Sequence, residues 1–245
     1  MRLFIKETFE DLSSQAAIDL IELMQAREDP LVCVASGDSP AGLYKNIAGK
    51  INKKELDISR WSFVGLDEWV GMNGTNEGSC RFHLNNQLFG PCHVKDTQIF
   101  FLDGSTEDLQ KECAEAETFV KQQGGIDVAI LGLGLNGHIG MNEPGTSLSS
   151  RTHVTTLDTL TQQTGQKYFK EQQQLNEGIT LGLATLMEAK YVMLLVSGPH
   201  KAAIVKKVLE GEISEEVPAS LLRGHPGLSV YLDAAAAELL QNDES

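Results

Sequence analysis

Residues 126–145 read IDVAILGLGLNGHIGMNEPG, and this stretch decides the fold class. Its first part, residues 126–133, is almost continuously apolar, as expected for a strand buried on both faces of a sheet. Its second part is rich in glycine and ends in Asn-Glu-Pro-Gly, which is typical of a loop. Such strands are typical of parallel sheets that helices cover on both sides.

The rest of the chain repeats this alternation. Further apolar runs of strand length lie at residues 3–5, 31–35, 62–66, 98–102, 191–197 and 228–232. Between them, segments such as 9–24 and 202–209 have the spacing of amphipathic helices. We therefore predict an α/β fold with a mainly parallel sheet and helices on both faces. Residues 1–240 are predicted to form a single domain, followed by a polar tail at 241–245.

The composition excludes several classes of partner. The 245 residues include 20 Lys and Arg against 34 Asp and Glu, a formal net charge of -14, so nucleic acid is a poor candidate partner. No charged leader or apolar run of about 18 residues is present, so we expect neither a signal peptide nor a membrane span. The four cysteines are far apart in the sequence. We expect reduced thiols and a cytoplasmic protein.

Ligands of such folds bind beyond the carboxyl ends of the strands, and three junctions there carry unusual residues. The first is the turn Ser36-Gly37-Asp38-Ser39 after the run 31–35. Ser39 is predicted to be the helix N-cap, with Pro40 as the first helical residue. Free N–H groups and hydroxyls there would suit a phosphate. On their own, these residues fit a plain capped turn better.

The second junction is the acidic pair Asp67 and Glu68, at the end of the run 62–66. Burial beside Trp69 could raise a carboxyl pKa towards that of a general base. Neighbours on a strand point to opposite faces, so only one of the two acids should serve a site. A solvated strand end explains the same residues equally well.

The third junction is the glycine-rich loop itself. Gly132, Gly134 and Gly137 spell the pattern of a dinucleotide site, but that site requires a helix to open at the glycines, and the loop ends in helix breakers. We predict instead that the loop holds His138 and Glu143 near a ligand. Asn136 could fix an orientation by hydrogen bonds. No second His or Cys has metal-ligand spacing, so we predict no metal.

Two lysines are candidates for binding an anion. Lys201 follows the run 191–197 and stands near the start of a helix, and Lys167 is a weaker candidate of the same kind. Surface lysines of an acidic protein are the commoner explanation for both.

Taken together, these motifs resemble those of the glucosamine-6-phosphate deaminase/isomerase family. The similarity rests on SGDSP at 36–40, LDEWVG at 66–71, NGHIGMNEPG at 136–145 and SLSSRT at 147–152. It is closest to the galactosamine-6-phosphate branch through LDEWV, GITLGL at 178–183 and VPAS at 217–220. The resemblance implies a modified Rossmann-like sheet, a hexosamine 6-phosphate substrate and no cofactor.

The resemblance also implies roles for the candidate residues. Asp67 would shuttle a proton between C2 and C1 of the sugar, and His138 would assist ring opening with Glu143 hydrogen-bonded to it. The products would be a ketohexose 6-phosphate and ammonia. The residues predicted to bind phosphate or substrate are Ser36, Gly37, Asp38, Ser39, Gly137, Lys167 and Lys201.

Several positions depart from the family pattern. Asp38 stands where Gly or Ser is usual, and we expect it to point away from the phosphate. Lys167 replaces an Arg, which loses a two-pronged grip on phosphate. Asn136 replaces an Asp, so that Glu143 alone is expected to orient His138. His153 and Thr155 occupy positions that are basic in allosterically regulated members, so we expect no such regulation.

Two alternatives fit parts of this pattern. A 6-phosphogluconolactonase would share the fold, but its loop continues towards Thr-Ala-Ser-Leu-Phe-Pro, which this loop does not. A non-catalytic sugar-phosphate sensor of a transcription regulator would need a DNA-binding segment and a basic face. The sequence leaves open the epimer preference and the choice between monomer and homo-oligomer. Arg223 and His225 are the candidates for contacts with O3 and O4.

Overall fold

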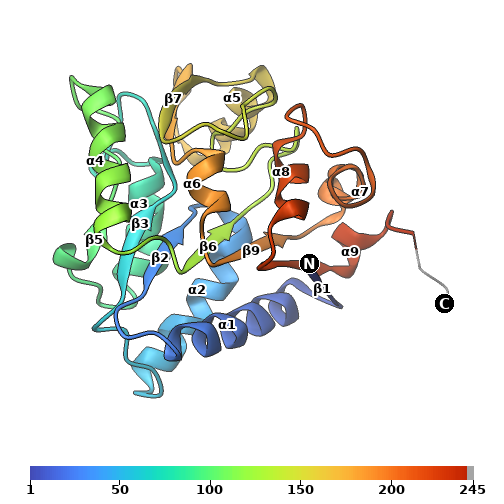
Figure 1. Cartoon of the computed structure of the whole chain (residues 1–245), viewed down its shortest axis with the longest axis horizontal. Coiled ribbons are helices and arrows are strands. Elements are labelled where there is room, and N and C mark those ends of the chain that lie inside the picture. The colour runs from blue at the N-terminus through green and yellow to red at the C-terminus, as the bar shows by residue number, and fades with distance from the viewer. Residues whose placement is uncertain (242–245) are drawn as a thin grey trace.

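The computed structural model describes residues 1–241 and places a seven-stranded parallel sheet at their centre (Figure 1). The strand order is β1-β10-β9-β6-β2-β3-β5, and every neighbouring pair is parallel. All seven strands lie in the apolar runs predicted from the sequence. Their bounds are β1 (Arg2–Lys6), β2 (Leu31–Val34), β3 (Ser62–Gly65), β5 (Ile99–Phe100), β6 (Val128–Leu131), β9 (Tyr191–Val196) and β10 (Leu228–Asp233).

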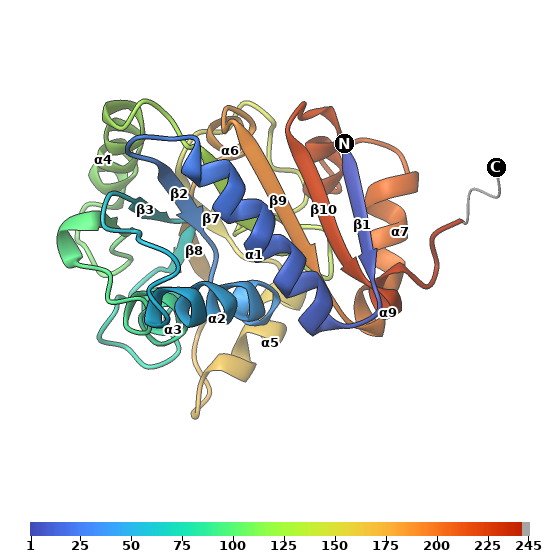
Figure 2. The same cartoon turned by 90° about the horizontal axis from the view of Figure 1, so that it is seen from below.

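Helices cover both faces of this sheet, as predicted (Figure 2). One face carries α1 (Phe9–Gln25), α2 (Asp38–Asn52), α3 (Cys80–Leu84) and the π-turn η1 (Asn85–Phe89). The other carries α4 (Leu109–Gln122), α6 (Leu183–Met187), α7 (Ala202–Glu210), α8 (Pro218–Leu221) and α9 (Ala234–Ala237). The remaining short helices are α5 (Thr159–Gly165), η2 (Asp96–Gln98), η3 (Gln166–Tyr168), η4 (Pro199–Lys201) and η5 (Leu222–Gly224).

The central strands β2, β6, β9 and β10 read as continuous apolar runs because both faces of the sheet are buried around them. Successive side chains of a strand point to opposite faces. In β2, Val32 and Val34 therefore pack with α1 and α2, whereas Leu31 and Cys33 pack in the core on the other face. Two cores, one on each side of the sheet, hold the strand ends in place.

A second sheet of three short antiparallel strands was not predicted. It consists of β4 (Asp67–Trp69), β8 (Glu177–Thr180) and β7 (His153–Thr156), in the order β4-β8-β7. Asp67 thus begins a strand of this sheet instead of ending β3. The strands are three or four residues long and carry polar side chains, so they lack the apolar periodicity by which a strand is recognised.

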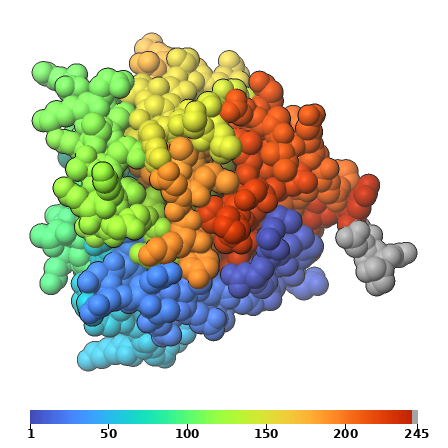
Figure 3. Space-filling model, viewed as in Figure 1, coloured from blue at the N-terminus to red at the C-terminus, as the bar shows by residue number. Residues whose placement is uncertain are grey.

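The segment around this second sheet also packs against the C-terminal third of the chain. In Figure 3 the yellow surface near residue 150 lies against the orange-red surface near residue 215. The backbone N–H groups of Gly145 and Leu148 donate to the backbone and side chain of Glu215, respectively. The loop at residues 145–148, which follows the glycine-rich stretch, is therefore held against Glu215 by two hydrogen bonds.

The start of α2 differs from the prediction. The helix begins at Asp38 with Gly37 as its N-cap, and no side chain caps it, so Ser39 lies in the first turn. Gly37 has a φ of +100°, which disfavours other residues, and a Cβ there would lie 2.8 Å from the Tyr168 hydroxyl. The tight turn at Gly37 starts the helix early and leaves its first N–H groups without a side-chain cap.

Two further predictions concern the C-terminal tail and membrane-spanning helices. Residues 242–245 of the predicted tail lie outside the described residues, while the backbone N–H of Gln241 donates to Glu210 at 2.6 Å. Among residues 1–241, no helix combines the length and apolar character needed to cross a membrane.

Candidate active site

A cavity of about 580 Å³ opens at the carboxyl ends of β2, β3, β6 and β9. Its walls are the loops after these strands, together with residues of α5 and η3. The three junctions singled out in the sequence therefore meet in one place. Eight of the predicted site residues line it: Ser36, Gly37, Asp38, Ser39, Asp67, His138, Lys167 and Lys201.

The two adjacent acids have different surroundings. Asp67 lines the cavity, and burial raises its pKa to about 6 against the opposing effects of a hydrogen bond with Cys80 and the charge of His138. Glu68 points away and accepts hydrogen bonds from the backbone N–H groups of Trp69, Cys80 and Arg81 at 2.8–2.9 Å. Asp67 is thus the acid that faces the cavity, while Glu68 anchors the start of α3.

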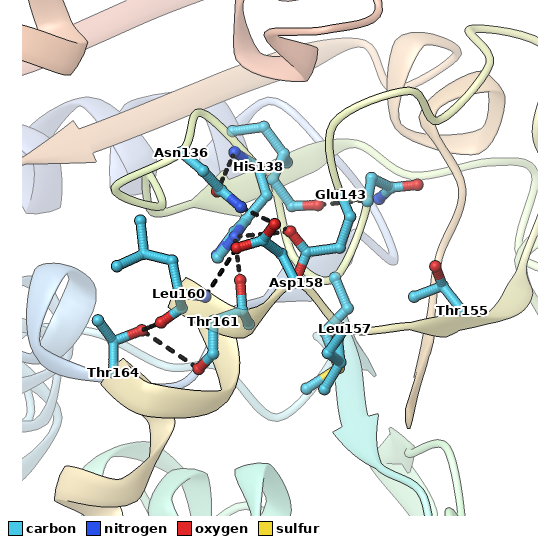
Figure 4. Close-up of polar contacts among 12 residues, drawn as sticks. Asn136, His138, Glu143, Thr155, Leu157, Asp158, Leu160, Thr161 and Thr164 are labelled. Carbon is cyan, nitrogen blue, oxygen red and sulfur yellow. Dashed lines mark hydrogen bonds and ion pairs between the residues drawn. The ribbon is translucent and has the colours of Figure 1, made fainter. Parts of the chain in front are cut away.

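A network of polar side chains holds His138 (Figure 4). Its Nδ1 lies 3.1 Å from the Thr161 hydroxyl and 3.5 Å from Glu143 Oε2. Asn136 Nδ2 donates to the same Glu143 oxygen at 2.8 Å. Asn136 therefore orients Glu143, and the expectation that Glu143 alone orients His138 is wrong, because Thr161 of α5 lies closer to the ring.

The charge state of Glu143 follows from this network. Burial alone would raise its pKa, but the hydrogen bonding and charge of His138, with hydrogen bonds from Thr161 and Asn136, hold that pKa below its ordinary value. Glu143 therefore presents a carboxylate to the imidazole of His138.

The glycine-rich loop opens no helix, as predicted, and it is tied to the second sheet. The buried Asn142 side chain donates to the carbonyl groups of Ile139 and Leu181, both at 2.9 Å. The ring of His138 packs on Gly134, where a Cβ would lie 2.4 Å from its Cδ2 and Nε2. A glycine at 134 is therefore required for the imidazole to sit in this loop.

Another part of the cavity wall is cationic. The uncapped start of α2 faces it, with Ser36 and Ser39 in the wall. The Lys201 ammonium donates to the Leu133 carbonyl, and burial, helped by repulsion from Lys167, lowers its pKa to about 8. Lys167 Nζ donates to Asp38 Oδ2 at 2.6 Å. Backbone donors, two hydroxyls and two ammonium groups together suit a phosphate.

Three candidates lie elsewhere. Gly137 is behind the wall, where a Cβ would meet Val217, and its carbonyl accepts from the Ala219 N–H. Arg223 donates to the Gly211 carbonyl, and buried His225 contacts the Ala189 carbonyl near the amino end of β10. The expectation that Arg223 and His225 contact O3 and O4 is wrong, since neither residue lines the cavity. His225 lies near the amino end of β10, whereas the cavity lies at the carboxyl ends of the strands.

The site also contains residues that sequence reasoning missed. Thr161, Tyr168, Cys80 and His83 line the same cavity. All four lie on α3, α5 or η3, in short segments without a strong apolar pattern. In residues 1–241, no three His, Cys, Asp or Glu side chains are grouped as metal ligands would be.

Comparison with known proteins identifies the family of the chain. Residues 6–230 match the family described as glucosamine-6-phosphate isomerases/6-phosphogluconolactonase. The chain belongs to this family. A glucosamine-6-phosphate deaminase of Clostridium tetani is 39% identical over 241 residues, covering 98% of this chain and 100% of the relative. Glucosamine-6-phosphate deaminase 1 of Bacillus subtilis is 36% identical over 240 residues, covering 98% and 99%.

Solved structures of family members show the same fold. A monomeric glucosamine-6-phosphate deaminase superposes with a TM-score of 0.94 at 36% identity, covering 98% of this chain and 100% of that one. A 6-phosphogluconolactonase of Trypanosoma brucei reaches 0.75 at 21% identity, covering 98% of each chain, which shows the fold alone. The predicted Rossmann-like α/β fold and the family are thereby confirmed. The family description joins two activities, that of glucosamine-6-phosphate isomerases and that of 6-phosphogluconolactonase.

Proposed function

We propose that this protein converts a hexosamine 6-phosphate and water into a ketohexose 6-phosphate and ammonia. The observation that carries the proposal is the cavity itself. A buried carboxyl with a raised pKa, Asp67, shares it with His138 and with the cationic start of α2. The names of the relatives support the same substrate class.

Ring opening is the first step. The O5 of the pyranose must gain a proton as the O1 hydroxyl loses one. His138 is suited to both transfers because Glu143 and Thr161 hold its Nδ1 side. The carboxylate of Glu143 stabilises the imidazolium that forms when the ring takes up a proton.

Isomerisation is the step assigned to Asp67. The carboxylate takes the proton from C2 of the open-chain sugar and returns it to C1, while a second proton passes from the C2 nitrogen to O1. The aldehyde thereby becomes an alcohol, and the C2 amine becomes an imine. A pKa of about 6 keeps Asp67 ionised at neutral pH and still basic enough to accept a carbon-bound proton. Water then adds to C2 of the imine, and loss of ammonia leaves a ketone at C2.

The phosphate end supplies orientation. Binding energy at a remote anionic group holds the reacting carbons at the base. The N–H groups of the first turn of α2, with Ser36, Ser39 and Lys201, are the groups that we assign to the phosphate. They lie in the same cavity as Asp67, as this mechanism requires.

The test is ammonia release from purified protein given glucosamine 6-phosphate and galactosamine 6-phosphate side by side. We expect turnover of at least one of the two sugars. The sequence motifs favour the galactosamine branch, whereas the relatives named above are glucosamine-6-phosphate deaminases. Failure with both sugars would overturn the proposal.

A lactonase is the enzymatic alternative, and a phosphate-binding sensor the other. Neither uses a basic Asp67 beside His138, which is why we prefer the deaminase. Hydrolysis of 6-phosphogluconolactone by the same preparation, measured in parallel, distinguishes the lactonase. We further propose that the enzyme works in the cytoplasm, supported by its four unpaired, buried cysteines, all within residues 1–241.

A further inference from the structure

Asp38 is a carboxylate placed where the proposed function needs to receive an anion. It is the first residue of α2 and lines the cavity beside Gly37. The sequence predicted that it points away from the phosphate. Its side chain is 77% exposed, and its Oδ2 accepts from Lys167 Nζ at 2.6 Å, across 129 residues of sequence.

The partners of Asp38 are the groups that a phosphate would use. A negative charge at a helix N-terminus is favoured by the helix dipole, and Lys167 is one of two ammonium groups in the cavity wall. The field of Asp38 also reaches Lys201 and His83, whose pKa values it raises against the lowering effect of burial. The carboxylate of Asp38 therefore makes some of the electrostatic interactions that a bound phosphate would make.

We propose that Asp38 is a resident anion that sets the affinity of this site for phosphate. In the empty protein it pairs with Lys167, and an arriving phosphate must share or take over that ammonium group against the repulsion of the carboxylate. Asp38 thereby weakens binding of every phosphate ligand. Free inorganic phosphate, which has no sugar to add contacts, is left with low affinity. The inference rests on the proposed function only in assigning phosphate to the start of α2.

The expected size of the effect follows from exposure. The side chain of Asp38 is 77% exposed and that of Lys167 55%, so solvent and salt screen the charges. We expect removal of the carboxylate charge to tighten phosphate binding by roughly two- to fivefold at low ionic strength. The gain should shrink as NaCl is added.

The experiment measures binding of inorganic phosphate to the full chain by calorimetry, which needs no catalytic activity. The variant is Asp38→Asn, with Asp38→Ser as a second variant of different shape. The matched control is Asp29→Asn. Asp29 is an exposed acid that pairs with Arg60 at 2.9 Å and lies before β2, at the amino ends of the strands. The Asp29→Asn substitution removes the same charge, and Asp29 does not line the cavity.

The proposal predicts tighter phosphate binding in both Asp38 variants and unchanged binding in Asp29→Asn. It also predicts that Lys167→Met costs more affinity in the Asp38→Asn background than in the natural chain, because Asp38 no longer competes for the ammonium. Binding that is equal or weaker in both Asp38 variants overturns it, and so does an equal gain in Asp29→Asn. If phosphate binding tightens but neither sugar phosphate releases ammonia, the proposed function fails and this inference stands.

Discussion

Two parts of the site differ in burial, and burial decides what each can do: the buried end, which is Asp67 with His138 and Glu143, and the cationic end, which is the start of α2 with Lys167 and Lys201. At the buried end Asp67 and Glu143 are 9% and 6% exposed, and their pKa values are shifted in opposite directions. At the other end Asp38 and Lys167 are largely exposed and paired. Proton transfer at neutral pH requires groups whose pKa values are shifted towards the working pH, and burial away from water produces such shifts. Capture of a hydrated phosphate requires donors that solvent can reach.

The largest expected effect comes from breaking the buried end. Asp67→Asn keeps the shape of the side chain but removes the base, so kcat should fall by roughly 10²- to 10⁴-fold. Steady-state kinetics of ammonia release measure this fall.

The control for Asp67→Asn is binding at the other end. Its affinity for inorganic phosphate, measured by calorimetry, should change little, since the start of α2 is untouched. Near-normal turnover in this variant would remove Asp67 from the role of base.

A smaller effect, mainly on KM, is expected at the cationic end. Lys201→Met removes an ammonium group from the proposed phosphate site, and KM should rise by roughly 10- to 100-fold, since a hydrogen bond to a charged group is worth about 1.5–3 kcal/mol. The fall in kcat should be smaller than the rise in KM. Because Lys201 also donates to the Leu133 carbonyl, a thermal unfolding curve has to show that the variant is folded. A loss confined to kcat would contradict the division between the two ends.

The pH dependence should report both ends at once. Asp67 must be ionised, so kcat/KM should fall about tenfold per pH unit below the pKa of about 6. Lys201 must be protonated, so kcat/KM should also fall above its pKa of about 8. A pH series of initial rates for the natural chain and for Lys201→Met separates the limbs, because the variant should lose only the alkaline one. A profile that stays flat down to pH 5 would argue against Asp67.

The fold was largely predictable because its signals are local. All seven strands of the main sheet coincide with apolar runs, and the signal is strongest in β2, β6, β9 and β10, which are buried on both faces. The second sheet left no such signal, because β4, β7 and β8 are only three or four residues long and mix polar with apolar side chains. The N-cap of α2 was misplaced for a related reason. Ser39 is a good capping residue, but the turn at Gly37 starts the helix one residue before it.

The candidate site was predictable only in part. The alternation of side chains along a strand predicts that one of Asp67 and Glu68 faces the ligand, but packing decided that it is Asp67. Thr161 comes from a seven-residue helix whose sequence gives no reason to place it beside His138.

By itself the sequence determined the parallel sheet, the glycine-rich loop and the loops where chemistry could occur, because apolar periodicity and turn residues act over a few neighbouring positions. Only the tertiary structure decided that α5 supplies Thr161 to the histidine and that Asp38 meets Lys167 across 129 residues. Such contacts depend on how distant elements pack, and that is determined by the whole core and not by any single stretch of the chain.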